Sequence, residues 1–334
     1  MAAPLRPLGL NGPLVHPIGI GAMSFSDFYG ATNEAESHAI LSAAIDMGVN
    51  HLDTANIYGM GTSEQAIGSF LKNQGARAHD FFTIASKGGI DRTSTARPFN
   101  NDHDYLTAEL DASLNRLGVE VIDLYYIHRR DQTVPLEDLV ETLTGMIKAG
   151  KIKSFGFSEI APTTLRAAAA LHPVAALQSE YSLSTRGVEL GNMQATQELG
   201  AAMVAFSPVG RGLLTDKPHT ADLIDIMPFM KVNPRFIEPN LSANIDATKP
   251  FRALAADMGM AASTLACAWL LHQADHVLPI PGTRSVSHFK ELVKAAEVTL
   301  TPADLAEIDA ILPPGWAHGD RYSQGQWNGV ERYC

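Results

Sequence analysis

The segment NHLDTANIYGMGTSEQAIGSFLKN, residues 50–73, contains the unit that is repeated along the chain. Residues 50–55 are predicted to form a buried strand, and residues 63–73 have the spacing of an amphipathic helix. Asp53 ends the hydrophobic run, and Tyr58 follows it in a loop of small residues. A buried strand, a polar loop and a helix together form the repeating unit of a parallel α/β fold.

The same alternation extends over most of the sequence. Ser63 and Asp102 are plausible N-caps of two of the helices, and Gly48 and Gly118 are expected to end two of them. The predicted strands cover residues 15–23, 50–55, 81–87, 121–128, 153–159, 176–181, 201–208 and 276–282, and the predicted helices cover 34–48, 63–73, 103–117, 136–150, 162–171, 188–199, 262–272 and 285–296. Eight such units in ~250 residues are typical of a closed (β/α)8 barrel, the TIM barrel.

The chain is longer than a minimal barrel, and three segments account for the surplus. They are a connection after strand seven at 209–250, an extra helix near 302–312, and a tail at 313–334. The connection exceeds the ~12–15 residues that are usual for an unstructured loop, so we expect it to fold over something. No linker-like change of composition interrupts the alternation. We therefore expect one domain over residues 1–334, with the connection and the tail covering the mouth of the barrel.

Composition narrows the class of protein. The 334 residues are 46% hydrophobic and carry a formal net charge of −11, which argues against general binding to nucleic acid or to anionic membranes. No secretory signal and no run of ~18 apolar residues is found. The two cysteines, Cys267 and Cys334, form no C-x-x-C pair, as expected in a reducing compartment. The expectation is a cytoplasmic protein that acts on a small molecule.

Three polar residues stand where predicted strands end. Asp53 follows strand two, Lys87 strand three and His128 strand four, while Tyr58 lies in the loop after strand two. Active sites of such barrels lie at the carboxyl ends of the strands, and adjacent strands are ~4.8 Å apart. A lysine ammonium beside a phenol favours the phenolate and lowers the phenol pKa, and an aspartate keeps the ammonium charged. A histidine can orient a carbonyl oxygen.

Each of these residues also has a structural interpretation. The aspartate could cap a turn, the tyrosine could lie on the rim, the lysine could be solvated, and the histidine could be a core residue. Their coincidence at successive strand ends favours a site that donates a proton to a carbonyl group.

Beyond these residues, the sequence resembles the aldo-keto reductases. The similar motifs are DTANIYGMGTSE (53–64), SKGG (86–89), YYIHR (125–129), GKIKSFGFSE (150–159), LQSEYS (177–182), AFSPVGRGLL (205–214) and IPGTRSV (280–286). The resemblance implies a (β/α)8 barrel that binds a nicotinamide dinucleotide. It also implies a catalytic tetrad of Asp53, Tyr58, Lys87 and His128, with Tyr58 as the proton donor in reduction.

The resemblance further implies a cofactor site. The positions carried over are Ser158, Glu159 and Gln178 for the carboxamide, Phe206 for stacking on the ring, Ser207, Val209, Gly210, Arg211, Gly212 and Leu213 for the pyrophosphate, and Gly282, Thr283, Arg284, His288 and Glu291 for the adenosine end. Arg284 favours NADPH through the extra phosphate, with NADH still possible. His288 and Leu292 replace the arginine and asparagine common in the family, so the expected preference is moderate. Without the motif, Phe206 would be taken for a core aromatic.

The substrate pocket is expected to be mostly apolar. The substrate is expected to enter between loops 24–31, 91–101 and 129–131, the long connection after residue 209 and the tail. Candidate lining residues are Phe25, Phe28, Tyr29, Arg129, Trp316 and Trp327. Arg129, Arg130 and Asp131 could meet a polar substrate, although a rim salt bridge is the preferred interpretation. Aliphatic aldehydes, aromatic aldehydes, sugars and polycyclic ketones all stay open, as do the direction of the reaction and the oligomeric state.

The sequence lacks the motifs of several other functional classes. GIGAMS (19–24) lacks the third glycine of a Rossmann fingerprint, and GFSEI (156–160) fails the nucleophile-elbow pattern. The histidines form no H-E-x-x-H motif, so no metal is expected. Two alternatives stay open: a Schiff-base lyase that uses Lys87, and an NADPH-binding regulatory protein with little turnover.

Overall fold

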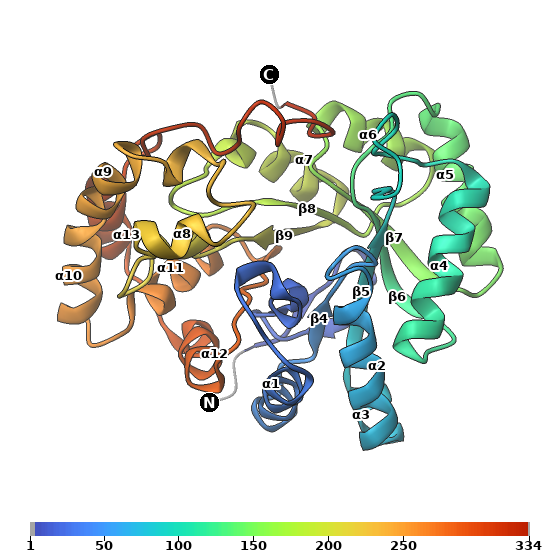
Figure 1. Ribbon diagram of the computed structural model, residues 1–334, viewed down its shortest axis with the longest axis horizontal. Coiled ribbons are helices and arrows are strands. Elements are labelled where there is room, and N and C mark those ends of the chain that lie inside the picture. Colours follow the sequence, from blue (N-terminus) through green and yellow to red (C-terminus); the bar gives the residue numbers. More distant parts are fainter. Residues whose placement is uncertain (1–3, 333–334) are drawn as a thin grey trace.

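The computed structural model describes residues 4–332, and a parallel sheet of eight strands lies at its centre (Figure 1). The strands are β3 (Ile20–Gly21), β4 (His51–Asp53), β5 (Thr83–Gly88), β6 (Ile122–Ile127), β7 (Ile152–Ser158), β8 (Ala176–Glu180), β9 (Ala202–Phe206) and β10 (Val277–Pro279). They pair in chain order from β3 to β10, each parallel to its neighbour.

Backbone hydrogen bonds close this sheet into a barrel. The Gly19 amide donates to the Pro279 carbonyl at 2.9 Å, and the Gly21 amide donates to the Pro281 carbonyl at 3.0 Å, so the first strand meets the last. A Cβ atom at Gly21 would stand 2.5 Å from the Ile280 carbonyl oxygen, which explains why a residue without a side chain is needed there. The predicted (β/α)8 barrel is confirmed.

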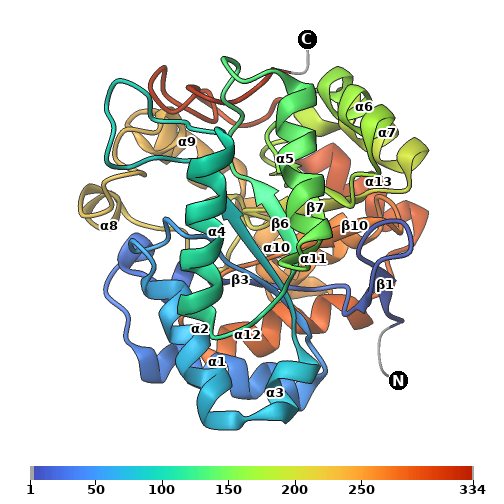
Figure 2. The same cartoon turned by 90° about the vertical axis from the view of Figure 1, so that its right-hand side faces the viewer.

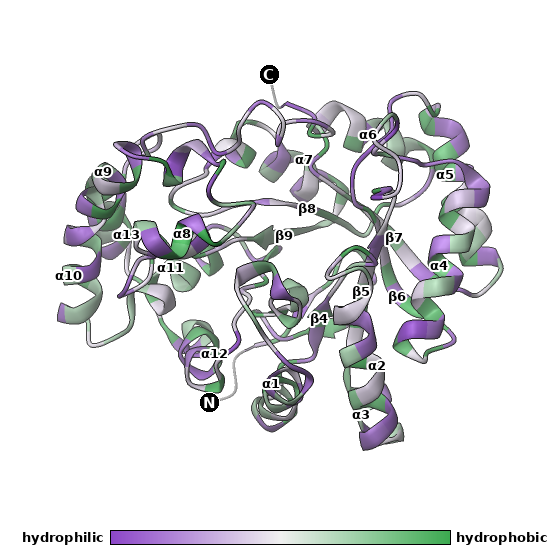
Figure 3. Cartoon of the chain, in the orientation of Figure 1, coloured by the Kyte–Doolittle hydropathy of each residue, from purple (hydrophilic) through white to green (hydrophobic). Residues whose placement is uncertain are grey.

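Helices surround the barrel on its outer face (Figures 1 and 2). They are α1 (Glu34–Met47), α2 (Thr62–Gln74), α3 (Ala76–Phe81), α4 (His103–Leu117), α5 (Leu136–Lys148), α6 (Pro162–Leu171), α7 (Asn192–Leu199), α8 (Ala221–Asp225), α9 (Asn240–Ala247), α10 (Lys249–Asp257), α11 (Ala262–Leu271), α12 (Val286–Val293) and α13 (Pro302–Ile311). Helices such as α4 and α10 carry hydrophobic and hydrophilic positions, whereas β9 is hydrophobic throughout (Figure 3). The strands are apolar on both faces because helices cover the outside and side chains fill the inside.

The expected helix ends are partly correct. Gly48 and Gly118 end α1 and α4 in the left-handed conformation, as predicted. The N-cap prediction for Ser63 is wrong: the residue lies inside α2, and its hydroxyl donates to the Ala22 carbonyl at 2.8 Å. Asp102 does precede α4, but its carboxylate binds Arg97 at 2.5 Å and does not cap the helix.

Several elements differ from the predicted ones. The first predicted strand, 15–23, is reduced to Ile20–Gly21, and a two-stranded antiparallel hairpin of β1 (Arg6–Pro7) and β2 (Leu14–Val15) precedes it. The connection after β9 contains α8 and α9 and continues into α10, none of which was predicted. With five and eight residues, α8 and α9 are too short to give a clear periodic signal. In α10 the spacing of Phe251, Leu254 and Ala255 is helical, so the sequence did contain a signal for this helix.

The tail after α13 runs along one end of the molecule, beside α9 and the loop that follows β5 (Figures 1 and 2). The Asn244 side chain in α9 donates to the His318 carbonyl at 3.0 Å and accepts from the His318 amide at 2.7 Å. Farther along, Gly329 lies against the ring of Phe99. The tail therefore joins the long connection to the opposite side of the barrel.

Two sequence expectations concern membranes and cysteines. Within residues 4–332, no single helix is long and apolar enough to cross a bilayer, although the bent pair formed by 240–257 and Ala262–Leu271 passes the test of length and composition. Cys267 is a free, buried thiol in α11. Cys334 lies outside the described residues.

Candidate active site

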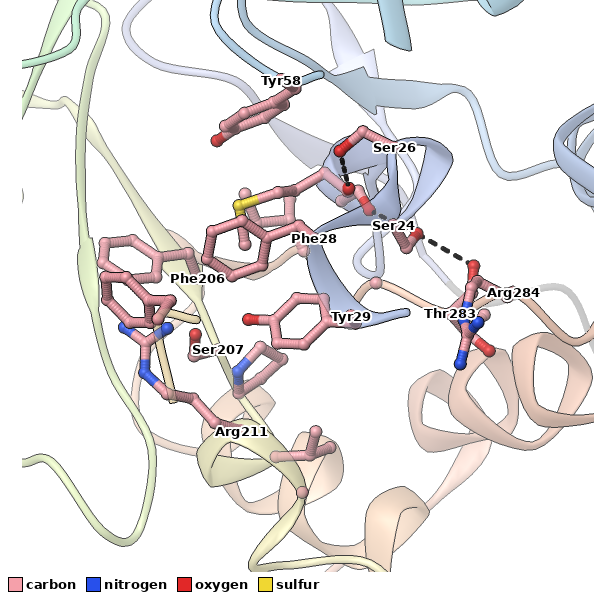
Figure 4. A pocket seen from close by; sticks show the side chains of 18 of the residues that line it. Ser24, Ser26, Phe28, Tyr29, Tyr58, Phe206, Ser207, Arg211, Thr283 and Arg284 are labelled. Atoms are coloured by element: carbon pink, nitrogen blue, oxygen red, sulfur yellow. Dashed lines mark hydrogen bonds between the residues drawn. The ribbon is translucent and has the colours of Figure 1, made fainter. Parts of the chain in front are cut away.

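A cavity of about 960 Å³ opens at the carboxyl ends of the barrel strands. Tyr58 lies at one side of it and Arg284 at the other, with Phe28 and Tyr29 between them (Figure 4). The predicted residues that line it are Asp53, Tyr58, His128, Ser158, Gln178, Phe206, Ser207, Val209, Arg211, Gly212, Gly282, Thr283, Arg284, His288, Glu291, Phe28, Tyr29 and Arg129. The volume is at the upper end of the range for small-molecule sites, as an extended ligand requires.

The four predicted catalytic residues come together at one side of this cavity. Lys87 is fully buried behind Tyr58, and its ammonium forms a short ion pair with Asp53 and donates to the Thr54 carbonyl at 2.7 Å. The ammonium stands 3.4 Å from the Tyr58 hydroxyl, and the rings of Tyr58 and His128 meet edge to face at 5.8 Å. Asp53 and Lys87 end adjacent strands, which explains why residues far apart in sequence converge here.

The pKa of Tyr58 differs from the sequence expectation. Burial raises the pKa of this phenol above its ordinary value of 10.0, and the opposing effect of Lys87 is smaller. The prediction that the neighbouring lysine gives a lowered pKa is therefore wrong for the net shift. Burial removes more hydration energy from the phenolate than the attraction of the Lys87 ammonium restores. The hydroxyl stays protonated at neutral pH, as a proton donor must.

His128 is electrically neutral in this setting. Burial lowers the pKa of its imidazole well below the ordinary 6.5, and the cations Arg129, Lys87 and Arg92 lower it further. Its Nδ1 atom has no hydrogen-bond partner among the described residues. A neutral imidazole that faces the cavity can orient a carbonyl oxygen but holds no proton to release at neutral pH.

The cavity also fits the polar groups of a nicotinamide carboxamide. The Gln178 side-chain amide donates to Asp53 at 2.8 Å, so its oxygen is available as an acceptor. The Ser158 hydroxyl accepts from Arg129 at 3.1 Å, so its own proton is available to donate. A carboxamide needs one donor and one acceptor, and these two side chains supply both.

The other end of the cavity suits a phosphate. Gly282 approaches the Gly21 backbone so closely that a Cβ would stand 2.8 Å from the Gly21 carbonyl oxygen. Arg284 and His288 flank the start of α12, where backbone amides and the helix dipole favour an anion. The Arg284 guanidinium donates to the Ala31 carbonyl at 2.5 Å and keeps its remaining donors for a ligand.

The comparisons with known proteins agree with this geometry. Residues 17–313 match the model of the Aldo/keto reductase family. The chain belongs to this family. It is 35% identical over 330 residues to the Schizosaccharomyces pombe aldo-keto reductase yakc, whose name specifies NADP(+), and the match covers 97% of this chain and 96% of the relative. A glycerol dehydrogenase from Gluconobacter oxydans has a similar structure, with a TM-score of 0.82 and 25% identity over 93% of this chain and 95% of that one. This aldo-keto reductase is accordingly an oxidoreductase.

Two of the predicted cofactor residues have other partners in this reductase. Glu159 does not line the cavity, because its carboxylate accepts from the Glu180 amide at 2.8 Å and binds Arg321 of the tail. Arg211 reaches the cavity, but its guanidinium is paired with Glu180 at 2.9 Å. Gly210 and Leu213 also lie outside the lining. The expectation that Glu159 holds the carboxamide is wrong, and Arg211 brings little uncompensated charge.

The predicted substrate residues divide in the same way. Phe28, Tyr29 and Arg129 line the cavity, whereas Phe25 is 2% exposed in the hydrophobic core. Trp316 is held away from the cavity by an indole hydrogen bond to the Leu183 carbonyl at 2.8 Å, and the indole of Trp327 binds Asp320 at 2.8 Å. The expectation that Phe25, Trp316 and Trp327 line the substrate pocket is therefore wrong.

The expected rim salt bridge forms for two of the three residues, whereas Arg129 forms no ion pair among residues 4–332. Arg130 pairs with Glu331 at 3.4 Å, and Asp131 pairs with Arg97 at 2.6 Å.

The loop at 91–101, the long connection and the tail do line the cavity, but their individual lining residues were not predicted. Among these residues are Arg92, His219, Phe229, Tyr322 and Gln326. They lie on loops and on the tail, whose positions follow from long-range contacts and not from local periodicity. For Arg92, its place four residues after the strand-end Gly88 was the available signal.

Lys87 is poorly placed for the alternative of a Schiff-base lyase. The amine is fully buried, is paired with Asp53, and stands behind Tyr58 and not in the cavity lining. Its pKa is raised above the ordinary 10.5, since Asp53 and Tyr58 outweigh the lowering effect of burial. A nucleophilic amine needs the reverse shift.

Proposed function

We propose that this protein catalyses the reversible, NADPH-dependent reduction of an aldehyde or ketone to an alcohol, with Tyr58 as the proton donor and residues 1–334 acting as one domain. The observation that carries the proposal is the Tyr58 hydroxyl on the cavity wall with the Lys87 ammonium 3.4 Å behind it. Membership of the aldo/keto reductase family supports carbonyl reduction in general. A bound reduced nicotinamide would supply the hydride.

The protein's part of the reaction is to hold the carbonyl and move one proton. His128 donates a hydrogen bond to the carbonyl oxygen and fixes its direction. As the carbonyl carbon gains the hydride, the C=O π electrons move to the oxygen, which takes the proton of the Tyr58 hydroxyl. Lys87 stabilises the phenolate that forms, and Asp53 keeps Lys87 charged and in place.

The lining of the cavity supports a set of cofactor positions. Ser158 and Gln178 would hold the carboxamide, Phe206 would stack on the ring, and Gly282 would allow the backbone to approach the pyrophosphate. Arg284 supplies the charge that prefers NADPH over NADH. The NADP(+) in the name of the fission-yeast relative supports this choice.

The test is the loss of NADPH absorbance with a panel of neutral aldehydes and ketones. Wild-type protein should turn over at least one of them, and Tyr58→Phe should lose that turnover while it keeps its NADPH affinity. Tight NADPH binding without oxidation across the whole panel would overturn the proposal and support a regulatory role.

A further inference from the structure

Two arginines line the cavity on the side opposite to the positions that suit the phosphates of the cofactor. Arg92 lies on the loop after β5 and Arg129 directly follows His128 after β6, and both line the cavity. The positions that suit the pyrophosphate and the adenosine end follow β9 and β10, which lie across the barrel from β5 and β6 in the strand order. The arginines are thus placed to meet the substrate and not the phosphates of the cofactor.

No carboxylate neutralises either arginine among residues 4–332. Arg129 donates to the His128 carbonyl at 2.6 Å and to the Ser158 hydroxyl, which are uncharged acceptors. Arg92 forms no ion pair within the described residues and is exposed to the cavity side of its loop. Two positive charges therefore remain beside the catalytic tyrosine, in a protein whose net charge is −11.

The nearby carboxylates are already occupied. Asp91 accepts from the Thr93 amide and hydroxyl at 2.8 and 2.6 Å. Asp131 is paired with Arg97, and Glu331 with Arg130. Asp53 is held by Lys87 and Gln178, so none of these groups is free to turn toward Arg92 or Arg129.

The loops that carry the two arginines are braced. Ile90 and Phe99 form an antiparallel bridge across the base of the Arg92 loop. The Asn101 side chain connects this loop to the next one, because it donates to the Arg129 carbonyl at 3.2 Å and accepts from the Asp131 amide at 2.7 Å. A fixed backbone lowers the entropy that is lost when a ligand is bound.

Apolar residues of the cavity lining lie next to these groups in the chain, since Ile57 directly precedes Tyr58 and Ile90 lies two residues before Arg92. We infer that the substrates of this enzyme are aldehydes or ketones with an apolar body and an anionic group, carboxylate or phosphate, that binds Arg92 and Arg129 while Tyr58 and His128 hold the carbonyl. This inference rests on the proposed function. The planar guanidinium fork matches both kinds of anion, so the two sources must be separated by experiment.

Matched substrate pairs provide the first test. The carboxylate pair is para-carboxybenzaldehyde and its methyl ester, and the phosphate pair is glyceraldehyde phosphate and glyceraldehyde. The ester group withdraws electrons more strongly than the carboxylate, so a preference for the acid cannot come from intrinsic reactivity. One or both anions should show a kcat/KM about three- to thirtyfold above that of the neutral partner, the range for one or two partly screened ion pairs. The ratio should fall when ionic strength rises.

Variants then assign the preference to the arginines. Arg92→Gln should lower the anion-to-neutral ratio about three- to fivefold, and Arg92→Lys should restore much of it. Arg77→Gln is the matched control, because Arg77 is also an exposed arginine with no ion pair in the described part of the chain, but it precedes β5 instead of following it. It should keep the wild-type ratio.

Arg129→Gln needs a second measurement, because this arginine also contacts the Ser158 hydroxyl. An unchanged dissociation constant for NADPH with a rise in KM for the anionic aldehyde alone would support the inference. Equal kcat/KM values within both substrate pairs would overturn it, and so would an Arg92→Gln ratio equal to that of wild type. In either case the reduction of the neutral aldehydes would leave the proposed function standing, whereas the absence of reduction with every compound would overturn both.

Discussion

Three buried ion pairs lie at the carboxyl end of the barrel, and two of them differ clearly in what they touch. Asp53 and Lys87 stand behind a tyrosine hydroxyl that faces the cavity. Glu159 and Arg321 connect the end of β7 to the tail and do not reach the cavity lining. Both involve almost fully buried side chains. A buried charge pair alone does not identify a catalytic group; its contact with a titratable group at the cavity does.

The largest effect on activity is expected at Tyr58, which connects the first ion pair to the substrate. Tyr58→Phe removes only the hydroxyl, so kcat/KM should fall by about 10²–10⁴, the range for the loss of a general acid. The dissociation constant for NADPH and the urea midpoint should change little. Steady-state kinetics with a neutral aldehyde, together with fluorescence titration of NADPH, measures both. Near-normal turnover would remove Tyr58 from its role.

The second pair, Glu159 and Arg321, should affect the stability of the fold and not the proton transfer. Arg321→Met leaves Glu159 buried without its guanidinium partner, so the free energy of unfolding should fall by about 3–5 kcal/mol in urea titrations. The double variant Glu159→Gln, Arg321→Met should recover a large part of the loss. If the single variant lost less than about 1 kcal/mol, the pair would not hold the tail.

The third buried pair, formed by Glu180 and Arg211, should make the stability of the fold depend on pH. Burial alone would raise the pKa of this carboxyl, but Arg211 and neighbouring arginines lower it to about 2 from 4.5. A pKa that is lower in the folded state stabilises the fold above pH ~4.5, and this contribution, about 3 kcal/mol, is lost as the pH falls toward ~2. Urea midpoints between pH ~5 and ~3 should therefore fall more steeply for wild type than for Glu180→Gln. Equal slopes would contradict the assignment.

The smallest effect is expected at an exposed pair. Arg166 and Glu198 are 2.7 Å apart on the outer helices, with side chains about 40% and 46% exposed. Arg166→Gln should change the free energy of unfolding by less than about 1 kcal/mol and leave kcat/KM unchanged. A larger loss would show that distance, and not burial, determines the strength of these pairs.

The sequence predicted the first buried pair and missed the second for a physical reason. Asp53, Lys87 and His128 each follow a buried hydrophobic run, and parallel strands place such ends side by side. Glu159 also follows a strand, but its backbone is in the left-handed region with φ 59°, and its carboxylate contacts Arg321, 162 residues away. No local pattern indicates such a contact.

The tail and the long connection were predicted as segments but not as structure. Trp316 was expected in the pocket because it is a large aromatic, yet its hydrogen bond to Leu183 joins residues 133 positions apart. Tyr322 lines the cavity although nothing in its neighbourhood marks it. Hydrophobic periodicity defines strands and helices, whereas irregular segments are positioned by contacts that only the folded chain contains.

The most direct test of Tyr58 as the proton donor is the pH dependence of kcat/KM for a neutral aldehyde with saturating NADPH. A general acid works while it is protonated, and burial raises the pKa of Tyr58 above 10.0. The rate should therefore hold from pH ~6 to ~9 and decline only near or above the ordinary phenol pKa of ~10. A rate that falls with rising pH at or below ~6.5, the ordinary imidazole pKa, would assign the proton to His128 and contradict the account.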